Sequence, residues 1–231
     1  MKFILRLPFT VLLLTLFLSI STFAQKEKKA AYGVLIDNTG SMRPQLGNIQ
    51  ILGKAIVQKT NQHGVISVFN FETQQDGKKP FAVVTSGTEW SQDKNTLEKY
   101  IDGLESVGGQ TTLFDAIRSI AKATVSKADS EKLAEKIIVL ITDGEDRVSE
   151  IKEKQLIKEL KEIGIKVYVI GLVTELGSER TIFEDSSKGK ATKFLKKVTK
   201  ETGGNAIFPK LKKDTKVGDL LTELFAEPPK K

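Results

Sequence analysis

The fold is decided by the stretch Tyr32-Gly33-Val34-Leu35-Ile36-Asp37-Asn38-Thr39-Gly40-Ser41, in which an apolar run changes abruptly into small polar residues. Residues 32–36 are apolar at successive positions, as in a strand that is covered on both faces. Immediately afterwards, Asp37, Thr39 and Ser41 place oxygen-bearing side chains at positions i, i+2 and i+4. A helical pattern follows. We therefore expect a buried strand, a polar turn and a helix.

Two segments further along the chain have the same character. Gly108-Gly109-Gln110-Thr111-Thr112 precedes a helical pattern, and Thr142-Asp143-Gly144-Glu145-Asp146 follows the apolar run Ile137–Ile141. The carboxyl ends of parallel strands lie at one edge of an open α/β sheet, which is where such folds bind ligands. We therefore predict that the three segments meet at that edge and form one site.

The pattern along the whole chain predicts an α/β fold: a doubly wound, mostly parallel six-stranded sheet flanked by helices. The expected strands lie near residues 31–37, 65–71, 80–85, 137–142, 166–172 and 205–208. The expected helices lie near residues 44–61, 92–102, 113–126, 149–163, 191–202 and 215–226. The second and third strands are joined by a short polar link and should form a hairpin, so one edge strand is expected to run antiparallel.

The chain begins with the features of a removable export signal. Lys2 and Arg6 precede an apolar core, and Thr22-Phe23-Ala24 fits the small-residue rule for cleavage, so residues 1–24 are expected to be removed. The rest is expected to comprise a charged leader, one folded domain and a disordered tail, at residues 25–30, 31–226 and 227–231. No other apolar segment is long enough to span a membrane, so no membrane span is expected in the mature chain. We expect an exported protein, either periplasmic or secreted.

The composition excludes several classes of site. The chain has no cysteine, which rules out disulfides, thiolate metal sites and lipid attachment through cysteine. Removal of Lys2 and Arg6 leaves 34 basic against 29 acidic residues, a net charge of +5. The lysines are spread over helix faces without an arginine cluster or aromatic-basic alternation, so nucleic acid is not expected as a partner.

The candidate ligands are all hard oxygen donors: the carboxylates of Asp37 and Asp143 and the hydroxyls of Thr39, Ser41 and Thr111. Such donors suit Mg²⁺, or alternatively Mn²⁺ or Ca²⁺, whereas zinc and copper sites use nitrogen and sulfur ligands. If neutral hydroxyls occupy most of the direct positions, the ion retains much of its positive charge and can attract an anionic oxygen from outside. We therefore expect ligand exchange rather than bond breaking.

Helix capping is the simpler explanation for each hydroxyl taken alone. Thr39 or Ser41 could cap the helix near 44–61, and Thr111 could do the same for the helix near 113–126. Ser91 is expected to cap the helix near 92–102, and Thr112-x-x-Asp115 has the spacing of a capping box. Three oxygen-rich segments in this order, each at a strand end or a helix start, nevertheless favour a shared cation site.

Other residues are candidates for supporting roles. Asp115 and Asp146 could contact water bound to the ion, although a helix-start carboxylate and a solvated loop residue are the simpler explanations. The polar excursion 174–190 leaves a predicted parallel strand at its carboxyl end and could border the site. Its candidates for a role in ligand specificity are Thr174, Glu175, Arg180, Glu184 and Asp185.

The combination of Asp37-x-Thr39-x-Ser41, Thr111 within GGQTTLFDAI and Asp143 within ITDGED resembles the metal-ion-dependent adhesion site of von Willebrand factor type A domains. The resemblance covers nearly all of the chain after residue 30. It implies a Rossmann-like fold, a bound divalent cation and a protein partner that supplies an aspartate or glutamate carboxylate, without catalysis. The family commonly has serine at the position of Thr39, whose methyl group crowds the coordination shell. The export signal and the absence of cysteine indicate a bacterial exported type.

Two alternatives stay open. Asp37 could be the phosphoryl-accepting nucleophile of a magnesium-dependent phosphatase-like hydrolase. Phosphatases of the haloacid-dehalogenase type, however, have a second aspartate two residues later, where this chain has Thr39. The chain could also be a scaffold with a vestigial metal site, which binds its partners through other surfaces.

Overall fold

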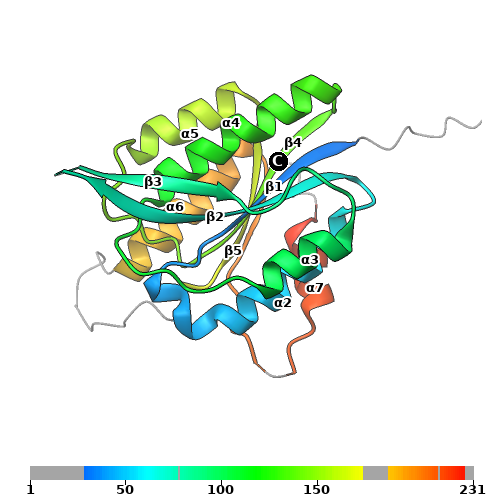
Figure 1. Ribbon diagram of the computed structural model, residues 1–231, viewed down its shortest axis with the longest axis horizontal. Helices are drawn as coiled ribbons and strands as arrows, with labels where there is room; N and C mark the ends of the chain where they lie inside the picture. Colours follow the sequence, from blue (N-terminus) through cyan, green and yellow to red (C-terminus); the bar gives the residue numbers. More distant parts are fainter. Residues whose placement is uncertain (1–28, 78, 174–186, 213, 227–231) are drawn as a thin grey trace, which may run out of the picture.

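The computed structural model describes residues 29–77, 79–173, 187–212 and 214–226, which form a six-stranded sheet between two layers of helices (Figure 1). The strands are β1 (Ala30–Ile36), β2 (Gly64–Asp76), β3 (Lys79–Ser86), β4 (Glu135–Thr142), β5 (Lys166–Gly171) and β6 (Ala206–Ile207). The α-helices are α2 (Leu46–Thr60), α3 (Lys94–Asp102), α4 (Leu113–Glu131), α5 (Glu153–Glu162), α6 (Ser187–Thr202) and α7 (Val217–Leu224). A 3₁₀ helix, η1 (Gly40–Gln45), lies between β1 and α2.

The strand order is β3-β2-β1-β4-β5-β6, and every neighbouring pair is parallel except β2 and β3. This topology confirms the predicted mostly parallel six-stranded sheet with one antiparallel edge strand. In the register of the sheet, Ile36 at the end of β1 pairs with Ile141 of β4. The segments that follow these two strands therefore start side by side at one edge of the sheet.

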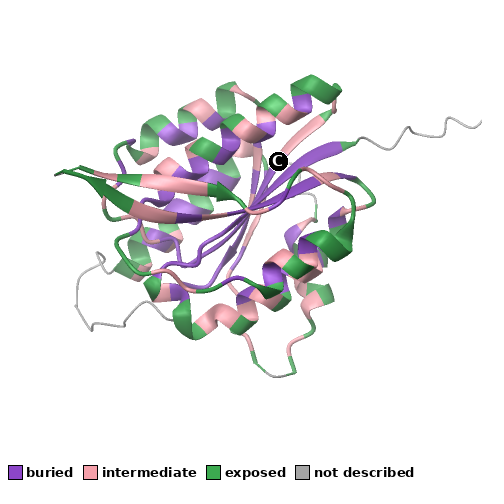
Figure 2. Cartoon of the chain, viewed as in Figure 1, coloured by how far each residue is buried: buried purple, intermediate pink, exposed green. Residues whose placement is uncertain are grey.

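Apolar side chains cover both faces of the sheet because successive strand residues point to opposite sides. On β1, Leu35 packs into a core that includes residues of α4, α5 and α6, whereas Val34 and Ile36 pack into a second core with residues of α2, α3 and α7. Figure 2 shows the buried strands at the centre of the molecule and the exposed residues on the outer surfaces of the helices. Full burial of each such side chain stabilises the fold by about 1.5–3 kcal/mol.

Several helices begin at other residues than predicted, and their caps differ as well. The helix expected near 44–61 is divided into η1 and α2, with Pro44 inside η1. Two predicted caps are wrong. Asp93 rather than Ser91 caps α3, because the Asp93 side chain accepts a hydrogen bond from the Asn95 amide.

The capping box predicted at Thr112 is also absent. The Thr112 hydroxyl shares a hydrogen bond with the Thr73 hydroxyl of β2 (2.9 Å) and makes no capping bond to α4. The Asp115 carboxylate accepts hydrogen bonds from the amides of Glu150 and Ile151, which come just before α5. Both side chains therefore connect separate parts of the chain instead of closing the start of one helix.

The described residues begin just before β1 and end just after α7. The predicted signal at 1–24, most of the leader at 25–30 and the tail at 227–231 lie outside them. Within the described part of the chain, no helix is long and apolar enough to cross a membrane.

Glycine 64 provides a test of the packing between β1 and β2. A Cβ atom at Gly64 would lie 1.9 Å from the carbonyl oxygen of Ala30, whereas one at Gly47 in α2 would meet no atom within 4 Å. We expect Gly64→Ala to reduce the free energy of unfolding by about 3 kcal/mol, because the strands must separate to admit the methyl group. The matched control Gly47→Ala should raise it by about 0.5–1 kcal/mol. Urea unfolding measures both changes, and equal stability of the two variants would contradict the packing described.

Candidate metal centre

Asp37 is the first residue after β1 and is completely buried at the carboxyl edge of the sheet. Its backbone amide donates to the carbonyl of Ile141 at 2.9 Å, so the sheet fixes its position. Oδ1 accepts hydrogen bonds from the amide (3.1 Å) and hydroxyl (2.7 Å) of Thr39. Oδ2 accepts a hydrogen bond from the hydroxyl of Thr142 at 2.6 Å. Both carboxylate oxygens are therefore held in a defined direction.

Thr39 and Ser41 follow on the turn that leads into η1. Thr39 is buried and precedes η1, but its side chain makes no capping hydrogen bond. The Thr39 hydroxyl donates its proton to Asp37, which leaves its oxygen lone pairs available to another partner. The hydroxyl oxygens of Thr39 and Ser41 are 3.4 Å apart. The structure thus favours a role beside Asp37 over helix capping for Thr39.

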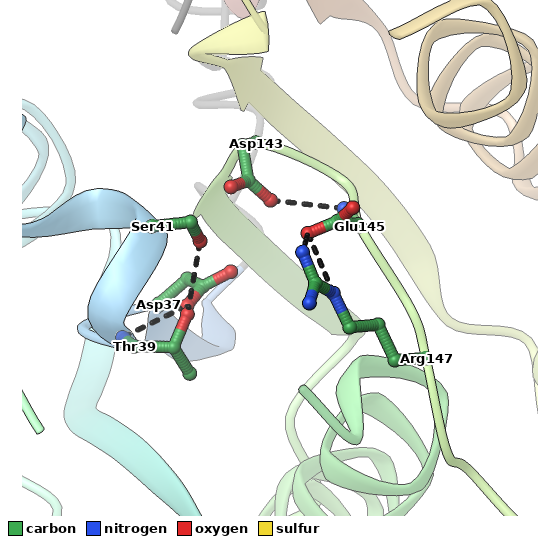
Figure 3. A network of polar contacts seen from close by, with 6 residues as sticks. All are labelled: Asp37, Thr39, Ser41, Asp143, Glu145 and Arg147. Carbon is green, nitrogen blue, oxygen red and sulfur yellow. Dashed lines mark hydrogen bonds and ion pairs between the residues drawn. The ribbon is translucent and has the colours of Figure 1, made fainter. Parts of the chain in front are cut away.

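Asp143 lies on the neighbouring loop, one residue after the end of β4. Gly144 has a positive φ of 81°, a conformation that glycine adopts easily and that turns the chain sharply here. Asp143 Oδ1 accepts a hydrogen bond from the Glu145 amide at 2.9 Å. Asp143 Oδ2 is buried and has no hydrogen-bond partner. In Figure 3 the carboxylates of Asp37 and Asp143 and the hydroxyl of Ser41 border a common space.

Burial makes the two carboxylates difficult to ionise together. Burial, followed by the charge of Asp143, raises the pKa of Asp37 from 3.8 to about 6, although the hydrogen bonds from Thr142 and Thr39 act in the opposite direction. Burial also raises the pKa of Asp143 above its ordinary value, while the hydrogen bond from the Glu145 amide favours its charged form. A cation between the two groups would relieve both effects.

The residues present fit a hard divalent cation. An unpartnered buried carboxylate oxygen is rare in folded proteins and here faces hydroxyl oxygens. Carboxylate and hydroxyl oxygens are donors that Mg²⁺ or Mn²⁺ accepts, in contrast to zinc. Within the described part of the chain, no three His, Cys, Asp or Glu residues are grouped to hold a metal. A site built here would therefore depend on hydroxyls as well as the two aspartates.

Thr111, the candidate ligand on the third loop, is buried close to the loop that carries Asp143. Its carbonyl oxygen accepts hydrogen bonds from the amides of Arg147 (2.9 Å) and Val148 (3.3 Å). The structure thus places the loop before α4 against the loop after β4, as the sequence predicted. Coordination through the Thr111 hydroxyl stays a prediction.

Asp115 and Asp146 hold these two loops together. Besides the bonds from Asp115 to the segment before α5, Asp146 Oδ1 accepts hydrogen bonds from the Phe114 amide (3.1 Å) and the Ser149 hydroxyl (2.5 Å). Asp146 is partly buried, and this burial raises the pKa of its carboxyl. Both aspartates therefore have backbone partners, and their contact with water bound to an ion stays a prediction.

Two contributors were not identified from the sequence. Thr142 donates to Asp37 and accepts from the Gly144 amide at 2.9 Å, so one hydroxyl joins the β1 and β4 loops. The sequence does contain an indication of this role, because Thr142 is a polar residue at the end of an otherwise apolar strand. Asn38 donates from its side chain to the carbonyl of Glu105 at 2.7 Å, and its own carbonyl accepts from the Val107 amide at 2.8 Å. No local pattern indicates those partners, which lie nearly 70 residues away.

The predicted specificity residues Thr174, Glu175, Arg180, Glu184 and Asp185 lie outside the described residues. Their role therefore stays a prediction.

Comparison with known proteins gives one family and several similar folds. The family profile described as von Willebrand factor type A domain matches residues 33–220. No curated protein matches the chain. Among solved structures, the pilus adhesin SpaC from Lactobacillus rhamnosus GG, in its open conformation, has 14% identity and a TM-score of 0.54, over 79% of this chain and 28% of that chain.

A second solved structure contains the three N-terminal domains of the type V pili tip protein Mfa5 from Porphyromonas gingivalis. It has 17% identity and a TM-score of 0.40, over 51% of this chain and 20% of that chain. The match thus spans less than a third of the length of either solved structure. At this level of identity, the likeness to SpaC indicates the fold alone.

The raised pKa of Asp37 predicts how stability depends on pH in ion-free buffer. Between about pH 4 and pH 6 the folded protein holds a proton at Asp37 that the unfolded chain has already released. The unfolding free energy should therefore decrease with rising pH, relative to that of Asp37→Asn, by on the order of 3 kcal/mol across this interval. Urea unfolding of both proteins at several pH values measures the difference. A difference that is constant from pH 4 to pH 7 would contradict the electrostatic account.

Proposed function

Because the chain belongs to the von Willebrand factor type A domain family, we propose that it is an exported, metal-dependent protein-binding module that acts in adhesion or assembly. In this proposal the residues that hold Mg²⁺, or alternatively Mn²⁺ or Ca²⁺, are Asp37, Thr39, Ser41, Thr111 and Asp143. A bound cation would supply a coordination position for a carboxylate oxygen of the partner. The observation that carries the proposal is the buried, unpartnered Oδ2 of Asp143 beside the hydroxyl-bearing turn.

The chain's own groups favour a cation site with an open coordination position over a saturated one. Asp37 already accepts three hydrogen bonds, which direct its carboxylate and reduce the charge that it can donate. The hydroxyls of Thr39 and Ser41 are neutral donors, so they would hold a cation without cancelling its charge. These features favour attraction of an external acidic side chain. They support a binding function better than a catalytic one.

The alternatives predict different behaviour. A magnesium-dependent phosphatase would hydrolyse aryl phosphates and lose that activity in Asp37→Asn, because a nucleophilic carboxylate would be missing. A vestigial site would leave thermal stability unchanged when divalent ions are added, because only ligands that bind the folded state raise it.

Ion binding is tested by thermal unfolding of the exported product of the full-length chain with and without Mg²⁺. We expect the wild type to gain about 2.7 kcal/mol at an ion concentration one hundred times its dissociation constant, seen as a rise in Tm. Asp143→Asn removes the charge repulsion without changing the size of the side chain, so it should be more stable than the wild type in ion-free buffer and show no response to Mg²⁺. A wild type that is equally stable with and without Mg²⁺ and Mn²⁺ would contradict the proposal.

Partner binding is tested by immobilising the same product and applying the extracellular and periplasmic proteins of its source cells. We expect at least one protein to bind in Mg²⁺, to be released by EDTA and to be absent from immobilised Asp143→Asn. Replacement of acidic residues in that partner, one at a time, should then abolish binding at a single position. Capture that persists both in EDTA and with Asp143→Asn would argue for a scaffold that uses another surface.

A further inference from the structure

A charged pair stands at the edge of the candidate metal centre. Arg147 donates from Nε (3.0 Å) and Nη2 (2.8 Å) to one carboxylate oxygen, Oε2, of Glu145. The Arg147 side chain is 57% exposed, whereas that of Glu145 is only 15% exposed. Figure 3 shows Glu145 between Arg147 and Asp143, on the same loop. A third carboxylate is therefore present on the loop that carries Asp143, and Arg147 holds it.

Glu145 is closely tied to Asp143. The Glu145 amide donates a hydrogen bond to Asp143 Oδ1 at 2.9 Å. The backbone of Glu145 is therefore in direct contact with a candidate metal ligand. After burial and the local hydrogen bonds, the charge of Glu145 raises the pKa of Asp143 and that of Arg147 lowers it. The charges of Glu145 and Arg147 thus shift the pKa of Asp143 in opposite directions.

The backbone on both sides of the pair is fixed. The Gly144 amide donates to the Thr142 hydroxyl at 2.9 Å, and the amides of Arg147 and Val148 donate to the Thr111 carbonyl. A Cβ at Gly144 would lie 2.7 Å from Leu195 of α6, so the turn is packed closely against that helix. The backbone of Arg147 is therefore held in place, and its side chain can hold the Glu145 carboxylate in one direction.

An ion pair with a largely exposed arginine adds little to stability, so its value to the fold does not explain its position. Its value to the site is clearer. A free Glu145 carboxylate on the same loop would compete with a partner's carboxylate at the high effective concentration of an intramolecular ligand. It would also cancel positive charge that the cation needs to attract that partner.

We propose that Arg147 is a positioning residue that holds the Glu145 carboxylate away from the cation and so keeps one coordination position open for the partner. This inference rests on the proposed metal-dependent function. Without Arg147, Glu145 would become a direct ligand, displace a water molecule from the ion and block the site from within.

The experiment compares four forms of the exported product: wild type, Arg147→Gln, Glu145→Gln and the double variant. Mn²⁺ serves as the probe, and both its affinity and the relaxation of water protons are measured, because relaxation reports water bound directly to the ion. We expect Arg147→Gln to bind Mn²⁺ roughly tenfold more tightly, as an added charged ligand does, and to lose part of its relaxation enhancement. Glu145→Gln and the double variant should both retain the relaxation enhancement of the wild type.

The double variant distinguishes direct coordination by Glu145 from the effect of removing the positive charge of Arg147. Removal of Arg147 alone also removes a positive charge near the cation, which would tighten Mn²⁺ binding without changing the number of bound water molecules. Tighter binding by Arg147→Gln with wild-type relaxation, and affinity changes that add up in the double variant, would overturn the inference while leaving the proposed function intact. Failure of the wild type to bind Mn²⁺ would overturn the proposed function and this inference with it.

Discussion

The chemistry of this site depends on two buried carboxylates, Asp37 and Asp143, whose charges repel each other. They follow adjacent parallel strands, β1 and β4, so the sheet brings them to the same edge whatever their charges. Burial and mutual repulsion raise the pKa of Asp37 to about 6. Hydrogen bonds from Thr39 and Thr142 relieve only part of this cost. A proton or a cation at these carboxylates would reduce the repulsion between them.

The rest of the structure keeps these groups in register. Two apolar cores fix the strands between α4, α5 and α6 on one side and α2, α3 and α7 on the other. Asn38 donates a hydrogen bond to the Glu105 carbonyl and accepts one from the Val107 amide, which attaches the first loop to the segment that leads to Thr111. That segment is attached to the loop after β4 because the Thr111 carbonyl and the Asp115 carboxylate accept hydrogen bonds from amides there, and Asp146 accepts one from the Phe114 amide. Hydrogen bonds thus join each candidate loop to the next.

Local sequence pattern predicted the elements well and their connections poorly. The apolar runs before Asp37 and Asp143 identified two central strands, since only a strand covered on both faces needs such runs. Ser91 and Thr112 have the spacing of helix caps, but their side chains have other partners, and the Ser91 hydroxyl accepts a hydrogen bond from the Asp93 amide. The hydroxyl of Thr112 bonds to Thr73 of β2, and Asp93 caps α3. The part played by Asn38 depends on residues distant in sequence, which no local pattern indicates.

The most direct test of the central claim is a calorimetric titration of Mn²⁺ in buffers with different heats of ionisation, at pH 6 and pH 8. If the cation replaces the proton that Asp37 holds below its pKa, binding should be saturable at one site. It should release about half a proton at pH 6 and almost none at pH 8, since the pKa of Asp37 is about 6. The absence of saturable heat at both pH values would contradict the account. So would binding whose proton release does not change with pH.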